Sequence, residues 1–264
     1  MTDLNAIRQA VVGLCLEVGA FIRQEGATFD RNKIEHKGFN DLVSYVDKTA
    51  EERLVAGLSQ ILPGAGFIAE EGTADDRQQK QVWIIDPLDG TTNFTHGLPP
   101  FAISVALVQE GTPVVGVVYE IGANEMYSAV AGEGAQCNGK PIQVAASTQL
   151  SQCLMATGFP YNEFAWLDKY LNVLQKFMQH THGVRRFGSA AVDLAYVACG
   201  RFDGFFEYGL KPWDVAAGGL IVQEAGGQVS DFSGADNWIF GGEIMAGNGV
   251  HSEMLQIVKE NWKA

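Results

Sequence analysis

Cysteine is scarce in this chain of 264 residues: there are four, far apart in the sequence and without a CxxC pair. This spacing is not that of a zinc site or a disulfide framework, and it is typical of free, buried thiols in a reducing compartment. No apolar run approaches the roughly 20 residues that cross a bilayer. The start Met1-Thr2-Asp3-Leu4 also lacks the basic and apolar segments of a secretory signal. We therefore expect a cytoplasmic protein that does not contact a membrane.

Positive charge is also in short supply, since 18 Lys and Arg residues face 31 Asp and Glu residues, which gives a net charge of −13. A surface of this sign argues against nonspecific nucleic-acid binding, because the nucleic-acid backbone attracts cationic proteins. An anionic small molecule would have to be met by a few local cations. Apolar residues make up 47% of the chain, which is enough for a large core, and the length permits one or two domains.

Apolar periodicity predicts a chain of mixed helices and strands. Apolar residues three and four apart indicate an amphipathic helix at 3–24 and a second helix that begins near Asp47 and ends before Pro63. The polar stretch 26–40 between them is typical of a loop or a short hairpin. Three strand-like runs between 101 and 130, separated by short polar turns, indicate an antiparallel meander.

Further strands and helices alternate through the rest of the chain, without a repeat, a low-complexity tract or a Pro/Ser-rich linker. This intermixing favours an α/β chain of the α+β class, with two mixed sheets in one compact unit. We expect residues 1–264 to form a single domain of two lobes, at about 1–145 and 146–264. The predicted strands are 66–69, 82–85, 101–108, 114–119, 125–130, 150–156, 184–187 and 202–208, and the later helices are 162–180, 189–199, 214–225 and 250–262.

The segment 83–94 carries the most chemical information. It indicates a buried strand that ends in two carboxylates three residues apart, Asp86 and Asp89, followed by a turn at Gly90. Two acids at the end of a strand suit a hard cation, which takes oxygen ligands. The amides from Gly90 onward can open a helix, a position that favours a phosphate group. The alternative is a plain surface turn at Asp89-Gly90 that Asp86 caps.

Two further acidic residues stand where a predicted strand or helix changes direction. Glu70 follows a strand, and Asp214 opens a helix. Carboxylates in such positions can converge while the strands behind them stay in place, and together they need compensating cations. Each candidate also has a structural alternative. Asp214 and Asp47 are typical helix N-caps, Thr91 is a typical turn hydroxyl, and Glu207 is typical of a solvated charge at a strand end.

Three segments together resemble the inositol monophosphatase family. Residues 86–94 match its first signature, Asp-Pro-x-Asp-Gly-Thr-x-Asn-Phe, and residues 213–218 match its second, Trp-Asp-x-Ala-Ala-Gly. The pair Glu70-Glu71 matches an upstream Glu-Glu pair, and the similarity runs nearly end to end. The resemblance implies a layered αβαβα sandwich, as in fructose-1,6-bisphosphatase, with the site between the lobes. It also implies a catalytic domain that is magnesium-dependent, lithium-sensitive and homodimeric.

The family positions imply two to three magnesium ions in each site. Glu70, Asp86 and the backbone carbonyl of Leu88 would bind the first ion, and a third, weaker ion would lie near Glu70. Asp86, Asp89 and Asp214 would bind the second ion. Two magnesium ions would balance the four carboxylates, and a third would leave the site attractive to phosphate. Magnesium also keeps waters and shares its ligands with substrate phosphate, which fits so sparse a protein cage.

The remaining family positions imply catalytic and substrate-binding roles. Thr91 would orient the attacking water, Asp47 would accept a proton behind it, and Glu70 would complete the catalytic group. The phosphate would be bound beside the metals, and the polyol would meet the loop 188–190 and a carboxylate on a later strand. The implied substrate-binding residues are Asp89, Gly90, Thr91, Gly188, Ser189, Ala190, Glu207 and Asp214.

Basic residues near these positions leave two questions open. Lys37 resembles a family lysine, but its gap to Asp41 is one residue shorter than in the animal enzymes, which leaves the geometry of the third metal open. Arg185-Arg186 could steer phosphate or make a subunit contact. The five histidines have no ligand spacing, and we assign them no catalytic role.

The resemblance implies a phosphomonoesterase that converts inositol monophosphate to myo-inositol and phosphate with a metal-activated water. Fructose-1,6-bisphosphatase, 3′-phosphoadenosine phosphatase and histidinol phosphatase are alternatives, because the metal site reads only the phosphate. A second phosphate would need a further cationic pocket. The candidates for it are four basic residues that cluster in the sequence: Arg185, Arg186, Arg201 and Lys211.

A partner-binding protein on the same scaffold is an alternative of another class, although all four acids are present.

Overall fold

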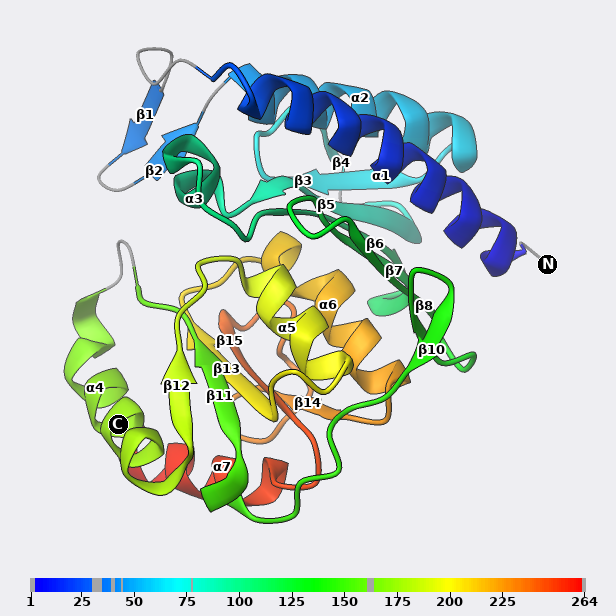
Figure 1. The fold of residues 1–264 in the computed structure, drawn as a ribbon. Helices are drawn as coiled ribbons and strands as arrows, with labels where there is room; N and C mark the ends of the chain where they lie inside the picture. The colour runs from blue at the N-terminus through cyan, green and yellow to red at the C-terminus, as the bar shows by residue number, and fades with distance from the viewer. Residues whose placement is uncertain are drawn as a thin grey trace.

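The computed structural model describes residues 3–29, 35–38, 41–43, 45–76, 78–160 and 164–262, with the backbone alone at 35–38, 41–43 and 75. Its elements form layers, as Figure 1 shows. Helices α1 and α2 cover one face of a first sheet, α5 and α6 lie between this sheet and a second, and α4 and α7 cover the outer face of the second. The main helices are α1 (Leu4–Gly26), α2 (Tyr45–Ile61), α4 (Leu167–His180), α5 (Ala190–Ala198), α6 (Pro212–Glu224) and α7 (His251–Asn261).

The first sheet contains eight strands in the order β10-β9-β8-β7-β6-β5-β3-β4. Neighbours pair antiparallel except β3 and β5, which run parallel. The predicted meander is confirmed, because β6, β7 and β8 pair in chain order. The strands are β3 (Gly66–Ala69), β4 (Asp75–Asp76), β5 (Gln81–Asp89), β6 (Ala102–Gln109), β7 (Thr112–Glu120), β8 (Glu125–Val130), β9 (Ala135–Cys137) and β10 (Lys140–Ile142).

The second sheet contains five strands in the order β12-β11-β13-β15-β14. β11 runs parallel to β12 and β13, and β15 is antiparallel to β13 and β14. The predicted strand at 150–156 is partly wrong, since residues 150–152 form a 3₁₀ turn and the strand begins at Leu154. The strands are β11 (Leu154–Thr157), β12 (Gly183–Arg185), β13 (Gly204–Tyr208), β14 (Gln228–Ser230) and β15 (Glu243–Gly247).

Helix α1 packs along the outer face of the first sheet. Asp3 caps it, because its carboxylate accepts hydrogen bonds from the N–H groups of Asn5 and Ala6. By length and composition alone α1 could cross a membrane, but Val11 and Ile22 are fully buried in the core that the helix shares with the sheet. This packing is that of a core helix. All four cysteines are free: Cys15 and Cys153 are buried, and Cys137 and Cys199 are half-buried.

Two predicted helix caps are wrong by one turn. Asp47 is the third residue of α2, which begins at Tyr45, and Asp214 is the third residue of α6, which begins at Pro212. Proline favours the first helical position, because its fixed φ suits the helix and its missing N–H has no partner there. Asp214 reaches back instead and accepts a hydrogen bond of 2.7 Å from the N–H of Lys211. Both carboxylates therefore lie inside the first turn.

Candidate active site and metal centre

The C-terminal end of β5 brings two carboxylates, Asp86 and Asp89, to the boundary between the first sheet and α6. Asp86 is 2% exposed and lies within β5, so it does not cap a surface turn. Its Oδ1 accepts a hydrogen bond of 2.9 Å from the N–H of Leu88. Gly90 then turns the chain with φ of +94° into the short helix α3 (Thr91–His96). A side chain at this position would lie 3.0 Å from the carbonyl of Pro100, so both the backbone angle and the space require glycine.

Asp86, Asp89 and Asp214 meet at this boundary, with carboxylate oxygens within 4.8 Å of one another. Asp214 comes from α6, more than 120 residues further along the chain. Burial raises the pKa of Asp89 to about 6 and that of Asp214 to about 7. Burial and the negative charges of Glu70, Asp89 and Asp214 raise the pKa of Asp86 well above its usual range. Arg186 lowers the pKa of Asp89 and Lys211 lowers that of Asp214, but the pKa values of all three acids stay raised, so these two cations do not balance the cluster.

These donors fit a hard divalent cation. Each carboxylate offers oxygen, no soft ligand lies in the cavity lining, and the mutual repulsion of the acids is what a cation would relieve. Glu70 follows β3 and lines the same cavity as Asp86. The carbonyl of Leu88 lies 3.0 Å from the hydroxyl of Thr91, next to the acids. The predicted ligand set is thus assembled in one place by residues from three separate segments.

A hydrogen-bonded pair, the half-buried Thr91 and the buried Asp47, lies beside this cluster. The Thr91 Oγ1 is 2.9 Å from Oδ1 of Asp47 and 3.0 Å from the carbonyl oxygen of Leu88. Asp47 is 1% exposed. A hydroxyl has one proton to donate, and here both neighbours are acceptors. The free lone pairs of Thr91 can therefore accept a hydrogen bond from a water molecule in the cavity.

The turn that follows Glu70 is held by a buried carboxylate, Glu51, that the sequence did not single out. Glu51, on α2, has no exposed surface. It accepts hydrogen bonds of 2.7 Å from the N–H of Glu71 and of 2.9 Å and 2.7 Å from the N–H and hydroxyl of Thr73. These bonds fix the turn that follows β3. In the sequence Glu51 has the pattern of a surface residue in an amphipathic helix, so only the fold reveals its role.

The loop before α5 fixes one of the carboxylates. Asp89 Oδ2 accepts hydrogen bonds of 2.7 Å from both the hydroxyl of Ser189 and the N–H of Ala191. Ser189 also caps α5, since its Oγ accepts from the N–H of Val192 at 3.4 Å. The Ser189 hydroxyl proton is thus already used within the protein. Gly188, Ser189 and Ala190 all line the cavity, as their predicted substrate role requires.

Glu207 lies in the same cavity, whose volume is about 370 Å³. It is 7% exposed, so the alternative of a solvated charge at a strand end is wrong. A side chain at Gly158 would lie only 1.9–2.1 Å from the Glu207 carboxylate, which shows how closely this carboxylate packs on the backbone that follows β11. Burial raises the pKa of Glu207 well above its usual range, Asp214 and Asp89 raise it further, and Arg186 lowers it.

The cavity contains one residue that the sequence analysis missed, Asp193, and one whose role it left open, Arg186. Asp193, on α5, is 1% exposed and lines the cavity. Arg186 lines it too, with its guanidinium carbon 5.6 Å from the ring centre of Phe159. Arg185 is exposed and does not line the cavity, so of the two adjacent arginines only Arg186 lies where an anion in the cavity would bind. Successive side chains along a strand point to opposite faces of the sheet. This alternation is the signal in the sequence that could have shown that one of the two arginines faces the cavity and the other does not.

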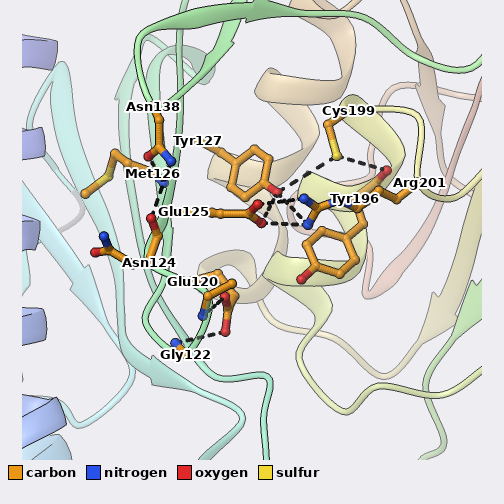
Figure 2. Close-up of polar contacts among 11 residues, drawn as sticks. Glu120, Gly122, Asn124, Glu125, Met126, Tyr127, Asn138, Tyr196, Cys199 and Arg201 are labelled. Carbon is orange, nitrogen blue, oxygen red and sulfur yellow. Dashed lines mark hydrogen bonds and ion pairs between the residues drawn. The ribbon is translucent and has the colours of Figure 1, made fainter.

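The second phosphate pocket that an alternative bisphosphate substrate would need is not assembled from the four clustered basic residues in the described part of the chain. Arg201 forms two hydrogen bonds of 2.6 Å with Glu125, and Figure 2 shows this pair together with Tyr127 and Cys199. It does not line the cavity, and Arg185 does not either. Of the four basic residues that cluster in the sequence, the cavity contains Arg186 and Lys211.

Lys37 lies on β1 (Glu35–Gly38), which pairs with β2 (Asp41–Val43) in an antiparallel hairpin. The hairpin agrees with the expectation for the polar stretch after the first helix. The side chain of Lys37 is outside the described part of the chain. Its role and the geometry of a third ion stay predictions.

A layered α+β fold with an acidic centre between its two sheets defines the class of this protein. The chain belongs to the inositol monophosphatase family, whose model matches residues 3–263. It is 46% identical to the putative Nus factor SuhB of Neisseria meningitidis serogroup B, over 91% of this chain and 93% of that one. It is 40% identical to an inositol-1-monophosphatase of Mesorhizobium japonicum, over 97% of both chains. The crystal structure of the extragenic suppressor protein suhB from Bartonella henselae superimposes with a TM-score of 0.91, at 38% identity over 97% and 99% of the two chains.

The raised pKa values predict how pH acts on the metal-free protein. Asp89 and Asp214 titrate near 3.8 when unfolded and at about 6 and 7 when folded, so the folded state binds more protons between pH 4 and 7. Their contribution to stability is complete below about pH 3.8 and is lost as the pH rises through the folded pKa values. Urea unfolding after chelation, at steps from pH 4.5 to 7.5, should show this decline. It should be shallower in Asp214→Asn; equal slopes would contradict the assignment.

Proposed function

We propose that this protein is a magnesium-dependent phosphomonoesterase that hydrolyses inositol monophosphate to myo-inositol and phosphate. The observation that carries the proposal is the meeting of Asp86, Asp89 and Asp214 within 4.8 Å, beside the Thr91–Asp47 pair. Membership of the inositol monophosphatase family supports it. The relative named inositol-1-monophosphatase, at 40% identity over nearly the whole chain, supports the choice of substrate.

In the proposed hydrolysis, separate residues hold the metal, orient the water and accept its proton. A bound magnesium ion would supply positive charge for the phosphate and lower the pKa of water. Thr91 accepts a hydrogen bond from the attacking water, because its own proton is directed to protein acceptors. As the water attacks, it gives a proton to the Thr91 oxygen, and Thr91 passes its own hydroxyl proton to Oδ1 of Asp47, 2.9 Å away. The ligands that would hold magnesium are Glu70, Asp86, Asp89, Asp214 and the carbonyl of Leu88.

The balance of charge favours a single phosphate over a bisphosphate. The cavity contains Arg186 and Lys211, whereas Arg201 is engaged by Glu125 outside it. The leaving-group side contains the carboxylate of Glu207, which suits hydroxyl groups as hydrogen-bond donors. A phosphate-release screen tests the choice directly. Inositol 1-phosphate should be turned over faster than fructose 1,6-bisphosphate, histidinol phosphate and 3′-phosphoadenosine 5′-phosphate, and a reversed order would contradict the substrate assignment.

Glu207→Ala tests the polyol side of the site. If Glu207 accepts hydrogen bonds from ring hydroxyls, its loss removes contacts of about 1.5 to 3 kcal/mol. The ratio kcat/KM for inositol 1-phosphate should fall roughly 10- to 150-fold, and that for phenyl phosphate, which has no ring hydroxyls, far less. Glu224→Ala is the matched control, because Glu224 accepts hydrogen bonds from Gly132 and Gly134 outside the cavity. Equal losses for both esters would place Glu207 in support of the fold or the metal site.

A second candidate function is that of a Nus factor, which the name of the Neisseria relative at 46% identity suggests. The two functions are separable, because Asp214→Asn should remove hydrolysis and leave the surface intact. Cells of Neisseria meningitidis depleted of that relative provide the test. Rescue by wild type and by Asp214→Asn alike would support the second function, and no rescue by either would count against it.

The remaining features of the proposal concern the whole molecule. We propose that residues 1–264 act as a single catalytic domain of two lobes, because the acids come from elements of both sheets. We further propose a homodimer, in line with what the family resemblance implies, and a cytoplasmic location, in line with the four free cysteines. Light scattering on the purified protein tests the dimer, and a monomer at micromolar concentration would contradict it.

A further inference from the structure

Asp193 is a buried acceptor in the cavity that the proposed mechanism does not use. Its side chain is 1% exposed, it lines the cavity, and its Oδ1 has no hydrogen-bond partner among the described residues. Burying a carboxylate oxygen without a partner is costly, and most buried polar atoms in folded proteins are paired. A site that retains such an atom is suited to a ligand that donates a hydrogen bond to it.

The structural roles open to Asp193 are already filled by other residues. Ser189 caps α5 through its hydroxyl, so the helix does not need a second cap. The acids that meet within 4.8 Å as candidate metal ligands are Asp86, Asp89 and Asp214, and Asp193 is not one of them. These contacts therefore give Asp193 no structural role, and it lines the cavity together with Glu207.

The charges around Asp193 identify its neighbours. After burial, the negative charge of Glu207 does most to raise the pKa of Asp193, ahead of Asp89, and Arg186 lowers it. Arg186 also lowers the pKa of Glu207, so the two carboxylates and the guanidinium lie in one region of the cavity. Two carboxylates beside one guanidinium offer several acceptors and repel a further anionic substituent. A neutral compound with neighbouring hydroxyls fits this region best.

We infer that Asp193 is a second specificity-determining carboxylate, which together with Glu207 accepts hydrogen bonds from neighbouring hydroxyls of a neutral polyol leaving group. The inference rests on the proposed phosphatase function and deepens it. It assigns the rejection of doubly phosphorylated substrates to this pair of acids, and it gives α5 a role in reading the leaving group as well as in holding Asp89.

Asp193→Asn tests the inference, because it keeps the size of the side chain and replaces one acceptor by an amide donor. For inositol 1-phosphate, kcat/KM should fall roughly 10- to 100-fold, mainly through KM, and phenyl phosphate should lose less than about threefold. Among monodeoxy analogues of inositol 1-phosphate, the one that lacks the partner hydroxyl should show no penalty from the substitution. Asp203→Asn is the control, because Asp203 is a buried, hydrogen-bonded carboxylate outside the cavity. It should leave the ratio between the two esters unchanged.

The outcomes separate the inference from the proposed function. Equal losses for the two esters, or the same penalty on every deoxy analogue, would show that Asp193 only supports its neighbours and would overturn the inference. If wild type prefers another polyol ester, the same ratio is measured with that ester. If wild type hydrolyses no ester, the proposed function fails, and saturation-transfer NMR with myo-inositol decides. Binding to wild type that Asp193→Asn weakens would still support the role of Asp193, and equal or absent binding would overturn it.

Discussion

Asp214→Asn should lower turnover at least about a hundredfold while the protein stays folded. Asparagine keeps the side-chain size and an oxygen that can accept the hydrogen bond from Lys211, so the variant should stay folded. The lost charge removes one of the three carboxylates that meet within 4.8 Å. The expected loss is comparable with that of a major electrostatic stabiliser. Steady-state kinetics at saturating magnesium, with urea unfolding of the same samples, measure both effects.

Asp3→Asn is the matched control for this substitution. Asp3 accepts hydrogen bonds from two N–H groups at the start of α1, and asparagine is an equally good cap. Activity and stability should both stay near wild type in the control. Near-normal turnover in Asp214→Asn at saturating magnesium would remove Asp214 from the proposed ligands.

The parts of the fold that follow from local pattern could be predicted. Helix α1 and the meander β6–β8 depend on apolar spacing and on pairing between neighbours in the chain. Strands β14 and β15 could not be predicted, because each is short and β15 pairs with β13, about 40 residues earlier. A short apolar run such as Ile244–Ala246 has no periodicity of its own, and its strand conformation depends on partners that only the tertiary fold supplies.

The acids of the candidate site could be predicted because signatures place them at the ends of elements. The structure brings Asp86, Asp89 and Asp214 together, and it places Glu70 and Glu207 in the same cavity. Their roles as ligands or substrate contacts stay predictions, since geometry and family membership do not test them.

Asp193 could not be found in the same way. It stands inside the apolar stretch Ala190–Ala198, where a single acid has the pattern of a solvent-facing helix residue. Only the packing of α5 between the two sheets turns it toward the cavity. The choice between Arg185 and Arg186 depended in the same way on which side of β12 faces the site. Residues whose function comes from the placement of a whole helix or strand lack a local signal in the sequence.

Removal of divalent cations should abolish hydrolysis completely. The carboxylates that meet beside Thr91 repel one another, and their pKa values stay raised despite the nearby Arg186 and Lys211, so a bound cation would supply the missing charge. Protein dialysed against a chelator should release no phosphate from inositol 1-phosphate, and added magnesium should restore the full rate. Calcium prefers more ligands and longer bonds than magnesium, so it should restore little. Lithium at millimolar order should inhibit the restored enzyme, as the family resemblance implies, and insensitivity to lithium would weaken only that implication. Full turnover in excess chelator would show that these acids do not act through a metal.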